Sequence, residues 1–223
     1  MSIMGTRVIR VEDPVFLTRG ATYTDDLTDE RLTGALHLTF VRSPLAHARI
    51  TGIDATAARA APGVVDVITA AELDLTPTKH FPAVPDAMAR PWLAIDTVRF
   101  VGEPVAAVLT EHPYQGEDAA DLVEVDYDPL PVVVDMRQAV RDEVLLFPEA
   151  GTNVMASFGE PAPADFFDGC EVVVTQPMVN QRVAPVPLES RAAAAAWGED
   201  GRVTVWCTNQ GAQQARGQFG DWL

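Results

Sequence analysis

The pattern of hydrophobic and polar residues is clearest across residues 98–135, where it predicts a strand, a helix and a second strand in succession. Residues 105–109 form a short apolar run after a Gly-Glu-Pro sequence that is typical of a tight turn, so we expect a buried strand there. Residues 113–123 place apolar side chains at helical spacing and acidic ones opposite, which predicts an amphipathic helix. The alternating pattern that follows predicts a strand that ends near Pro129.

A second unit of the same kind precedes it in the chain. Apolar residues 50–53 lead to Asp54, a good N-cap for an alanine-rich helix that a Pro-Gly pair would stop. Residues 64–68 then predict another strand. Further upstream, residues 32–40 alternate between apolar and polar side chains, which predicts a strand with one buried face. The proline-containing residues 74–96 are expected to form a loop.

The last third of the chain has a weaker pattern. The β-branched residues 171–175 predict a strand, and residues 201–207 predict another after a turn. A helix is expected from Gly211 onward, with Asn209 near its N-cap. Five consecutive alanines within residues 188–197 favour a helix by propensity, but the segment is short, so helix and strand both stay open.

Composition narrows the class of protein. With 223 residues, 48% of them hydrophobic, the chain is long enough to bury a core and to hold one or two domains. The formal net charge of −16 disfavours binding to nucleic acid or to an anionic membrane surface. No apolar stretch is long enough to span a membrane and the N-terminal residues lack a signal-peptide core, so we expect a cytoplasmic protein.

Motifs that would identify a reaction are missing. The two cysteines cannot hold an iron–sulfur cluster by themselves, and we expect both to be small buried side chains. The histidines are scattered, which argues against a metal site, and Ser43 with His47 lacks an orienting acid for nucleophilic catalysis. The acidic residues of the predicted helix at 113–123 are expected to face solvent. The four histidines are His37, His47, His80 and His112.

The order of several short segments resembles the molybdenum hydroxylase family, the large molybdopterin-binding subunits of xanthine dehydrogenase, aldehyde oxidase and aerobic carbon monoxide dehydrogenase. Each segment is weak alone, but together and in this order they are specific. They are RVEDP at 10–14, GATYTDD at 20–26, RSPLAHARI at 42–50, PGV at 62–64, VRFVGEPVAA at 98–107, EDAADLVEVDYDPLP at 117–131, NQRVAPVPLESR at 180–191 and VTVWCTNQ at 203–210.

This resemblance implies an α+β fold in which an a/b hammerhead domain is followed by the first strands of a molybdopterin-binding domain. Residues 1–19, which show little periodicity, would be an extended N-terminal arm. Residues 20–134 would form the hammerhead domain, and residues 135–165 a connector. Residues 166–223 would begin the molybdopterin-binding domain and leave it incomplete. The resemblance also tips the alanine run toward a strand.

The same resemblance assigns one site residue. In the family, the Gln that closes the last of these segments hydrogen-bonds an oxo ligand of molybdenum, and that position is Gln210 here. Two neighbours depart from the family pattern: Asn209 stands where Thr is common, and Gln213 where His is common. The alternative for Gln210 is an amide that merely caps a loop. No metal ligand is expected from this chain.

The implied chemistry is the hydroxylation of aldehydes, N-heterocycles or a similar small substrate with water, at a molybdopterin cofactor. Residues outside this chain would complete the cofactor site, including a downstream glutamate base and a glycine-rich segment, so the chain alone should be inactive. The implied partners are the remainder of the molybdopterin-binding subunit and the iron–sulfur and FAD subunits or domains. The alternative is a non-catalytic hammerhead module that scaffolds an oxidoreductase complex or shapes its substrate funnel. Substrate identity and oligomeric state stay open.

Overall fold

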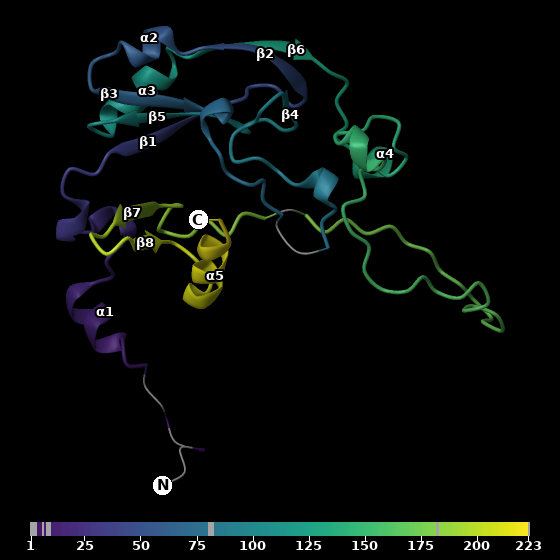
Figure 1. Cartoon of the computed structure of the whole chain (residues 1–223). Helices are drawn as coiled ribbons and strands as arrows, with labels where there is room; N and C mark the ends of the chain where they lie inside the picture. The colour runs from purple at the N-terminus through teal and green to yellow at the C-terminus, as the bar shows by residue number, and fades with distance from the viewer. Residues whose placement is uncertain (1–3, 6, 8–9, 80–82, 182, 223) are drawn as a thin grey trace. The chain divides into compact units, whose positions relative to one another are not determined.

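The computed structural model describes residues 4–5, 7, 10–79, 83–181 and 183–222. The chain divides into two compact units (Figure 1). One consists mainly of Gly34–Gln176, and the other combines Met1–Thr33 with Pro177–Asp221. Expectations for residues outside the described ranges, His80 among them, are not addressed by the structure.

The unit Gly34–Gln176 is built on two three-stranded antiparallel sheets. The first has the order β1-β5-β3 and the second the order β4-β2-β6. The apolar run at 105–109 therefore forms the central strand of its sheet, in which most side chains are buried. The strands are β1 (His37–Arg42), β2 (Ala48–Asp54), β3 (Val64–Thr69), β4 (Thr97–Val98), β5 (Pro104–Thr110) and β6 (Glu124–Pro129).

Both predicted strand-helix-strand units are present, but each connects the two sheets. Helix α2 (Thr56–Arg59) lies between β2 and β3, and α3 (Tyr114–Ala120) lies between β5 and β6. Ala55, not Asp54 as expected, occupies the N-cap position of α2, although the Asp54 side chain accepts a hydrogen bond from the backbone N–H of Thr56 at 2.8 Å. Helix α3 packs tightly on β1, because a Cβ at Gly116 would overlap the Thr39 hydroxyl.

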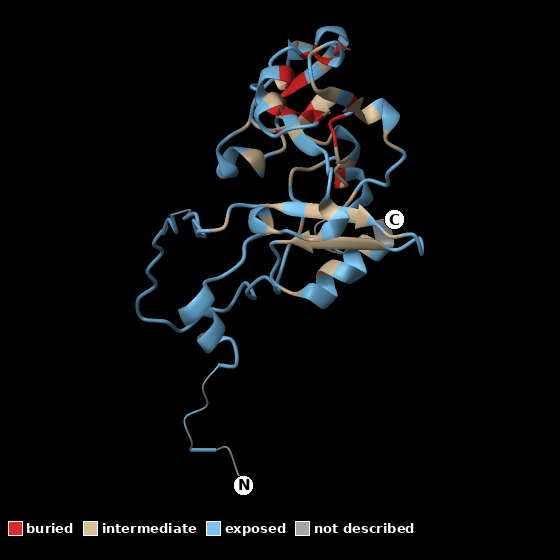
Figure 2. Cartoon of the chain, turned by 90° about the vertical axis from the view of Figure 1, so that its left-hand side faces the viewer, coloured by how far each residue is buried: buried red, intermediate tan, exposed pale blue. Residues whose placement is uncertain are grey.

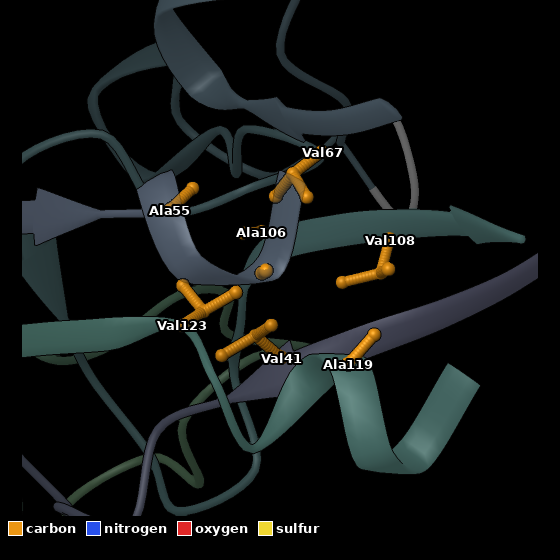
Figure 3. Packing of buried hydrophobic residues seen from close by; sticks show 8 residues of the cluster. Val41, Ala55, Val67, Ala106, Val108, Ala119 and Val123 are labelled. Atoms are coloured by element: carbon orange, nitrogen blue, oxygen red, sulfur yellow. The ribbon is translucent and has the colours of Figure 1, made fainter. Parts of the chain in front are cut away.

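Two clusters of buried apolar residues form the core of this unit. Figure 3 shows the larger one, in which residues from both helices pack against β1, β3 and β5. The smaller cluster joins the other sheet to the first residues of β5. In Figure 2 the buried segments lie in this unit, whereas β7, β8 and α5 of the other unit are intermediate or exposed. The larger cluster consists of Val41, Ala55, Ala58, Val67, Ala106, Val108, Ala119 and Val123.

Buried polar groups fasten the turn before β5. Gly102 has a φ of 90°, which agrees with the predicted tight turn. Its N–H donates to the carbonyl of Ser43, and the N–H of Ser43 donates to the carbonyl of Glu103 at 2.9 Å. The buried Glu103 carboxylate also accepts from the backbone N–H of Arg99. The RSPLAHARI and VRFVGEPVAA segments thus hold each other in place.

Within the described residues, the expected loop contains η4 (Asp86–Met88) and an isolated β-bridge between Thr78 and Arg90, and the connector contains α4 (Met136–Ala139) and η5 (Pro148–Ala150). The short helix η3 (Ala70–Glu72) precedes the loop. Asn153 organises the connector, because its side chain accepts from Leu146 and donates to the carbonyls of Ala139 and Val144. The described residues include no helix that is long and apolar enough to cross a membrane.

The second unit contains a β-hairpin and three helical segments from the N-terminal part. The hairpin pairs β7 (Ala193–Trp197) with β8 (Val203–Cys207) in antiparallel fashion. Helix α5 (Ala212–Trp222) follows the hairpin, as expected from the pattern after Gly211. The N-terminal segments are α1 (Asp13–Arg19), η1 (Thr24–Asp26) and η2 (Glu30–Leu32).

Four expectations were wrong in detail. The strand expected over 32–40 begins only at His37, because Leu32 belongs to η2 and Gly34 has a φ of 74°, and the face expected to be buried is not, since Leu38 is 50% and Phe40 40% exposed. Residues 171–175 form no strand, since no other segment of the described chain pairs with them. The N-terminal arm expected to be extended contains α1. Neither cysteine is buried: Cys170 is exposed and Cys207 intermediate.

Candidate functional site

The β7–β8 hairpin sets the frame of the site. Alanine residues form most of β7, and the ladder runs from the pair Ala193–Cys207 to the pair Trp197–Val203. One further hydrogen bond, from the N–H of Thr208 to the carbonyl of Ala192 at 3.2 Å, extends the pairing beyond the strands. The last residues before Gln210 are therefore held by the hairpin.

A side-chain-capped turn connects β8 to α5. The Asn209 side chain donates to the carbonyl of Cys207 at 2.9 Å and accepts from the N–H of Gly211 at 2.9 Å. These two bonds bridge the residues on either side of Gln210 and fix the turn. Asn209, the departure from the family pattern, thus makes a well-connected turn here.

Gln210 itself lies exposed in this turn. Within the described part of the chain its side chain makes no hydrogen bond, since the capping bonds belong to Asn209. A carboxamide offers two N–H donors and a carbonyl acceptor, so Gln210 can bind a ligand without breaking an existing contact. The capping hydrogen bonds that the structure shows in this turn are made by Asn209, and both roles expected for Gln210 stay predictions.

A carboxylate joins the segment before β7 to a distant part of the chain. Glu189 accepts hydrogen bonds at its Oε1 atom from the backbone N–H of Thr24 at 2.8 Å and from the Thr24 hydroxyl at 3.0 Å. The hydrogen bonds from the backbone and side chain of Thr24 hold the pKa of Glu189 below its usual range.

A second set of contacts joins the same N-terminal segment to β8. The Arg31 guanidinium stacks 4.7 Å from the centre of the Trp206 ring and donates to the Thr204 hydroxyl at 3.1 Å. Asp29 orients Arg31 through two hydrogen bonds of 2.8 Å and 2.6 Å. The side-chain and backbone hydrogen bonds from Arg31 lower the pKa of Asp29 to about 2.

The other residues that the sequence offered as candidates, the histidines, cysteines, acidic residues and Ser43, do not form a site among the described residues. Among the described residues, no group of three His, Cys, Asp or Glu side chains could hold a metal ion. His47 is buried, with Nδ1 2.6 Å from the carbonyl oxygen of Pro131, and the Ser43 hydroxyl donates to the carbonyl of Leu45. Both therefore serve the packing of the first unit, and the acidic side chains of α3 face solvent as expected.

A long run of apolar side chains is exposed along residues 166–188. Leu188 is 93% exposed and Met178 88% exposed, values that are unusual for large apolar side chains in a folded protein. The exposed side chains are those of Phe166, Phe167, Val172, Val173, Val174, Met178, Val179, Val183, Val186 and Leu188.

Comparison with protein families gives the assignment. Residues 18–131, just over half of the chain, match the family model described as aldehyde oxidase and xanthine dehydrogenase, a/b hammerhead domain. The chain belongs to this family. Residues 146–223, which include Gln210, match the molybdopterin cofactor-binding domain. The resemblance and the α+β fold with its hammerhead domain are thereby confirmed.

Curated relatives support the same assignment. The large subunit of nicotine 6-hydroxylase from Paenarthrobacter nicotinovorans is 39% identical over 94% of this chain and 26% of its own length. The carbon monoxide dehydrogenase large chain of Afipia carboxidovorans is 36% identical over 93% of this chain and 27% of its own length. The chain thus spans about a quarter of the length of these relatives, and both are named as parts of larger assemblies.

The fold is also found in solved structures. Quinoline 2-oxidoreductase from Pseudomonas putida 86 is similar over 98% of this chain and 28% of its own, with a TM-score of 0.82 and 31% identity. The domain boundaries expected at residues 20, 134 and 166 stay predictions, because the hammerhead family model ends at residue 131 and the cofactor-binding model begins at residue 146.

The contact between Glu189 and Thr24 was not predicted from the sequence pattern. The Glu189–Thr24 contact joins residues 165 positions apart, so no local spacing announces it. The available signal was the presence of both residues in segments that resemble the family.

Proposed function

We propose that this chain is the N-terminal portion of the catalytic, molybdopterin-binding subunit of a molybdenum-dependent oxidoreductase. The complete protein would hydroxylate an aldehyde, an N-heterocycle or a similar small substrate with water as the source of oxygen. The family assignment, and relatives named for nicotine, quinoline and carbon monoxide, support this reaction class.

The single observation that carries the proposal is the side-chain amide of Gln210, which is exposed in a capped turn and makes no hydrogen bond with the residues that the structure describes. The turn lies between β8 and α5, within the range that matches the cofactor-binding domain. An amide N–H suits an oxygen ligand of molybdenum, because such a ligand accepts hydrogen bonds and carries partial negative charge. The residues present therefore fit the cofactor at this one position.

The contribution of the chain is orientation. Gln210 would hold one side of the cofactor, and the Asn209 bonds would keep its backbone from moving. When bound, the molybdenum centre supplies the two-electron oxidation chemistry. The base and the other cofactor contacts would come from the rest of the subunit, so the isolated chain should be inactive.

The partners we propose are that remainder and the iron–sulfur and FAD subunits or domains. The exposed apolar side chains along residues 166–188 support the first of these, because a large apolar surface is stable in water only when another surface covers it. The relatives' names, as a large subunit and a large chain, support the second. A cytoplasmic location stays a prediction, which cell fractionation would test.

A second candidate is a scaffold or substrate-funnel module without a catalytic residue. It is favoured by one observation: all the buried apolar residues of the described chain lie between Val41 and Val123, in the unit without Gln210. In that case the function of the complex would depend on the buried core of this unit rather than on the exposed turn that contains Gln210.

Replacement of Gln210 in the complete enzyme separates the two. We expect Gln210→Ala to lower turnover at least tenfold, as is typical when a group beside a metal ligand is lost, with molybdenum content unchanged or reduced. Gln214→Ala, an exposed glutamine on α5, is the matched control and should leave turnover unchanged. Wild-type turnover in Gln210→Ala, with full molybdenum content by mass spectrometry, would favour the scaffold.

A further inference from the structure

We propose that residues 171–175 form a β-strand in the complete subunit, by pairing with the edge of a sheet that the remainder of the subunit supplies. The inference rests on the proposed function, because it needs that remainder, and it names the kind of surface through which the two parts join. Val172 and Val174 would form the apolar face of this strand.

The backbone of residues 171–175 has no hydrogen-bonding partner within the described chain. These residues belong to no helix or strand, and their N–H and C=O groups make no backbone hydrogen bond there. Three valines and a threonine make the segment β-branched, and a proline two residues after it would end a strand. A segment with the side chains of a strand and unpaired backbone groups is a ready template for pairing with another strand.

The side chains alternate so that a strand here has one wholly apolar face. In a strand Val172 and Val174 point to the same side. Glu171, Val173 and Thr175 point to the other side, which carries a carboxylate and a hydroxyl. Val172 is 75% and Val174 81% exposed, against 51% for Val173. The apolar face is thus the more exposed one, and we expect the remainder of the subunit to bury it.

The lack of charge around this segment defines the kind of partner. Residues 172–181 carry no charged side chain, although 22% of the whole chain is charged. Edge strands that stay unpaired usually carry charged side chains, which disfavour pairing with another strand. Here the partner would be recognised by backbone hydrogen bonds and by apolar contacts to alternate side chains, as in other cases of strand addition. Ion pairs would contribute little.

The remainder of the subunit is the occupant that the comparisons support. The segment lies within residues 146–223, which match the molybdopterin cofactor-binding domain. The matched part makes up 26% and 27% of the lengths of the two relatives, so about three quarters of such a subunit is available to supply a strand. A second copy of this chain is the competing occupant, and the first experiment distinguishes the two.

Hydrogen–deuterium exchange, measured by mass spectrometry on the complete subunit and on the 223-residue chain, tests the pairing. We expect the amides of residues 171–175 to exchange at least about 100-fold more slowly in the complete subunit than in the shorter chain. The amides of β5, the central strand of its sheet, are the internal reference and should be protected in both. Equally rapid exchange of residues 171–175 in both proteins would overturn the proposal. Protection that rises with the concentration of the shorter chain would also overturn it, because a second copy would then be the partner.

Two neighbouring substitutions test the assigned face. Val174→Lys places a charge on the apolar face, whereas Thr175→Lys adds the same charge to the opposite face. In the complete subunit we expect Val174→Lys to reduce the protection of residues 171–175 at least about tenfold, and Thr175→Lys to leave it within about twofold. Equal losses from both substitutions would contradict the assigned face. If the Val174→Lys subunit does not fold, Val174→Ala removes apolar contact without adding charge and should reduce protection in the same direction.

The exchange measurement does not depend on turnover, which separates this inference from the proposed function. Unprotected residues 171–175 in a complete subunit that holds molybdenum and turns over its substrate would overturn the pairing alone. A complete subunit without molybdenum and without oxidoreductase activity would overturn the proposed function, even where residues 171–175 are protected.

Discussion

The close packing of α3 on β1 leads to a prediction about the sign of a stability change. At Gly116 an added Cβ would overlap the Thr39 hydroxyl and would lie 3.0 Å from the Thr39 Cβ. Thr39 is β-branched and has few alternative rotamers in a strand, so it cannot turn away freely. Gly116→Ala must therefore move α3 or strain β1.

Two opposing terms give the magnitude. Replacing glycine by alanine inside a helix stabilises it by about 1 kcal/mol. Overpacking a fitted contact costs about 1–3 kcal/mol. We therefore expect Gly116→Ala to lower the free energy of unfolding by roughly 0–2 kcal/mol, where helix propensity alone predicts a gain.

Urea unfolding of the 223-residue chain, followed by circular dichroism, measures this change. Gly217→Ala in α5 is the matched control, because its added Cβ meets no atom within 4 Å and should raise helix stability. Thr39→Ala in the Gly116→Ala background removes the overlapping oxygen and should restore at least half of the loss. A gain in stability from Gly116→Ala equal to that from Gly217→Ala would refute the close contact.

Three further changes have expected outcomes. Val108→Ala leaves a cavity in the larger core cluster and should lower the free energy of unfolding, measured in urea, by about 2–3 kcal/mol. Val65 on β3 is half exposed, so Val65→Ala should lower it by less than about 0.5 kcal/mol. Equal losses in the two variants would contradict the assigned core. Because the pKa of Asp29 is lowered from 3.8 to about 2 in the folded state, its ionised carboxylate stabilises the fold fully above pH 3.8, and this stabilisation is lost as the pH falls through about 2. NMR titration should therefore give a midpoint near 2, and Arg31→Met should return that midpoint toward 3.8. An unchanged midpoint in that variant would rule out Arg31 as the cause. Asn209→Ala removes the turn cap and should lower the stability of α5 by about 1 kcal/mol in thermal unfolding, with no loss expected if the turn is held elsewhere.

The sequence alone predicted an element correctly where residues within the segment or next to it define its ends. The apolar run of β5 stands between a Gly-Glu-Pro turn and a polar exit, and the structure has a buried strand there. The helix after Gly211 was likewise readable from residue types at fixed offsets, whereas the N-cap expected at Asp54 lies one residue later, at Ala55. In these cases the physical cause of the element lies within a few residues of it.

Non-local pairing decided the remainder. Residues 171–175 have high β-propensity but find no partner strand in the described chain, whereas the alanine run pairs with β8 and becomes a strand against its helical propensity. Gln210 was assigned only through the resemblance, because a single glutamine after a strand has no pattern of its own. Glu189 could not be found from spacing, since its partner is 165 residues away.

The placement of β5 has a consequence for the order of folding during synthesis. β5 is the centre of its sheet but the last of its three strands to be made, so β1 and β3 have no ladder partner until residue 110 has emerged from the ribosome. The sheet β1-β5-β3 can then pair, while residues 24–31 wait for Glu189 and β8. The turn with Gln210, which follows β8, is thus among the last parts of the described chain to gain its contacts.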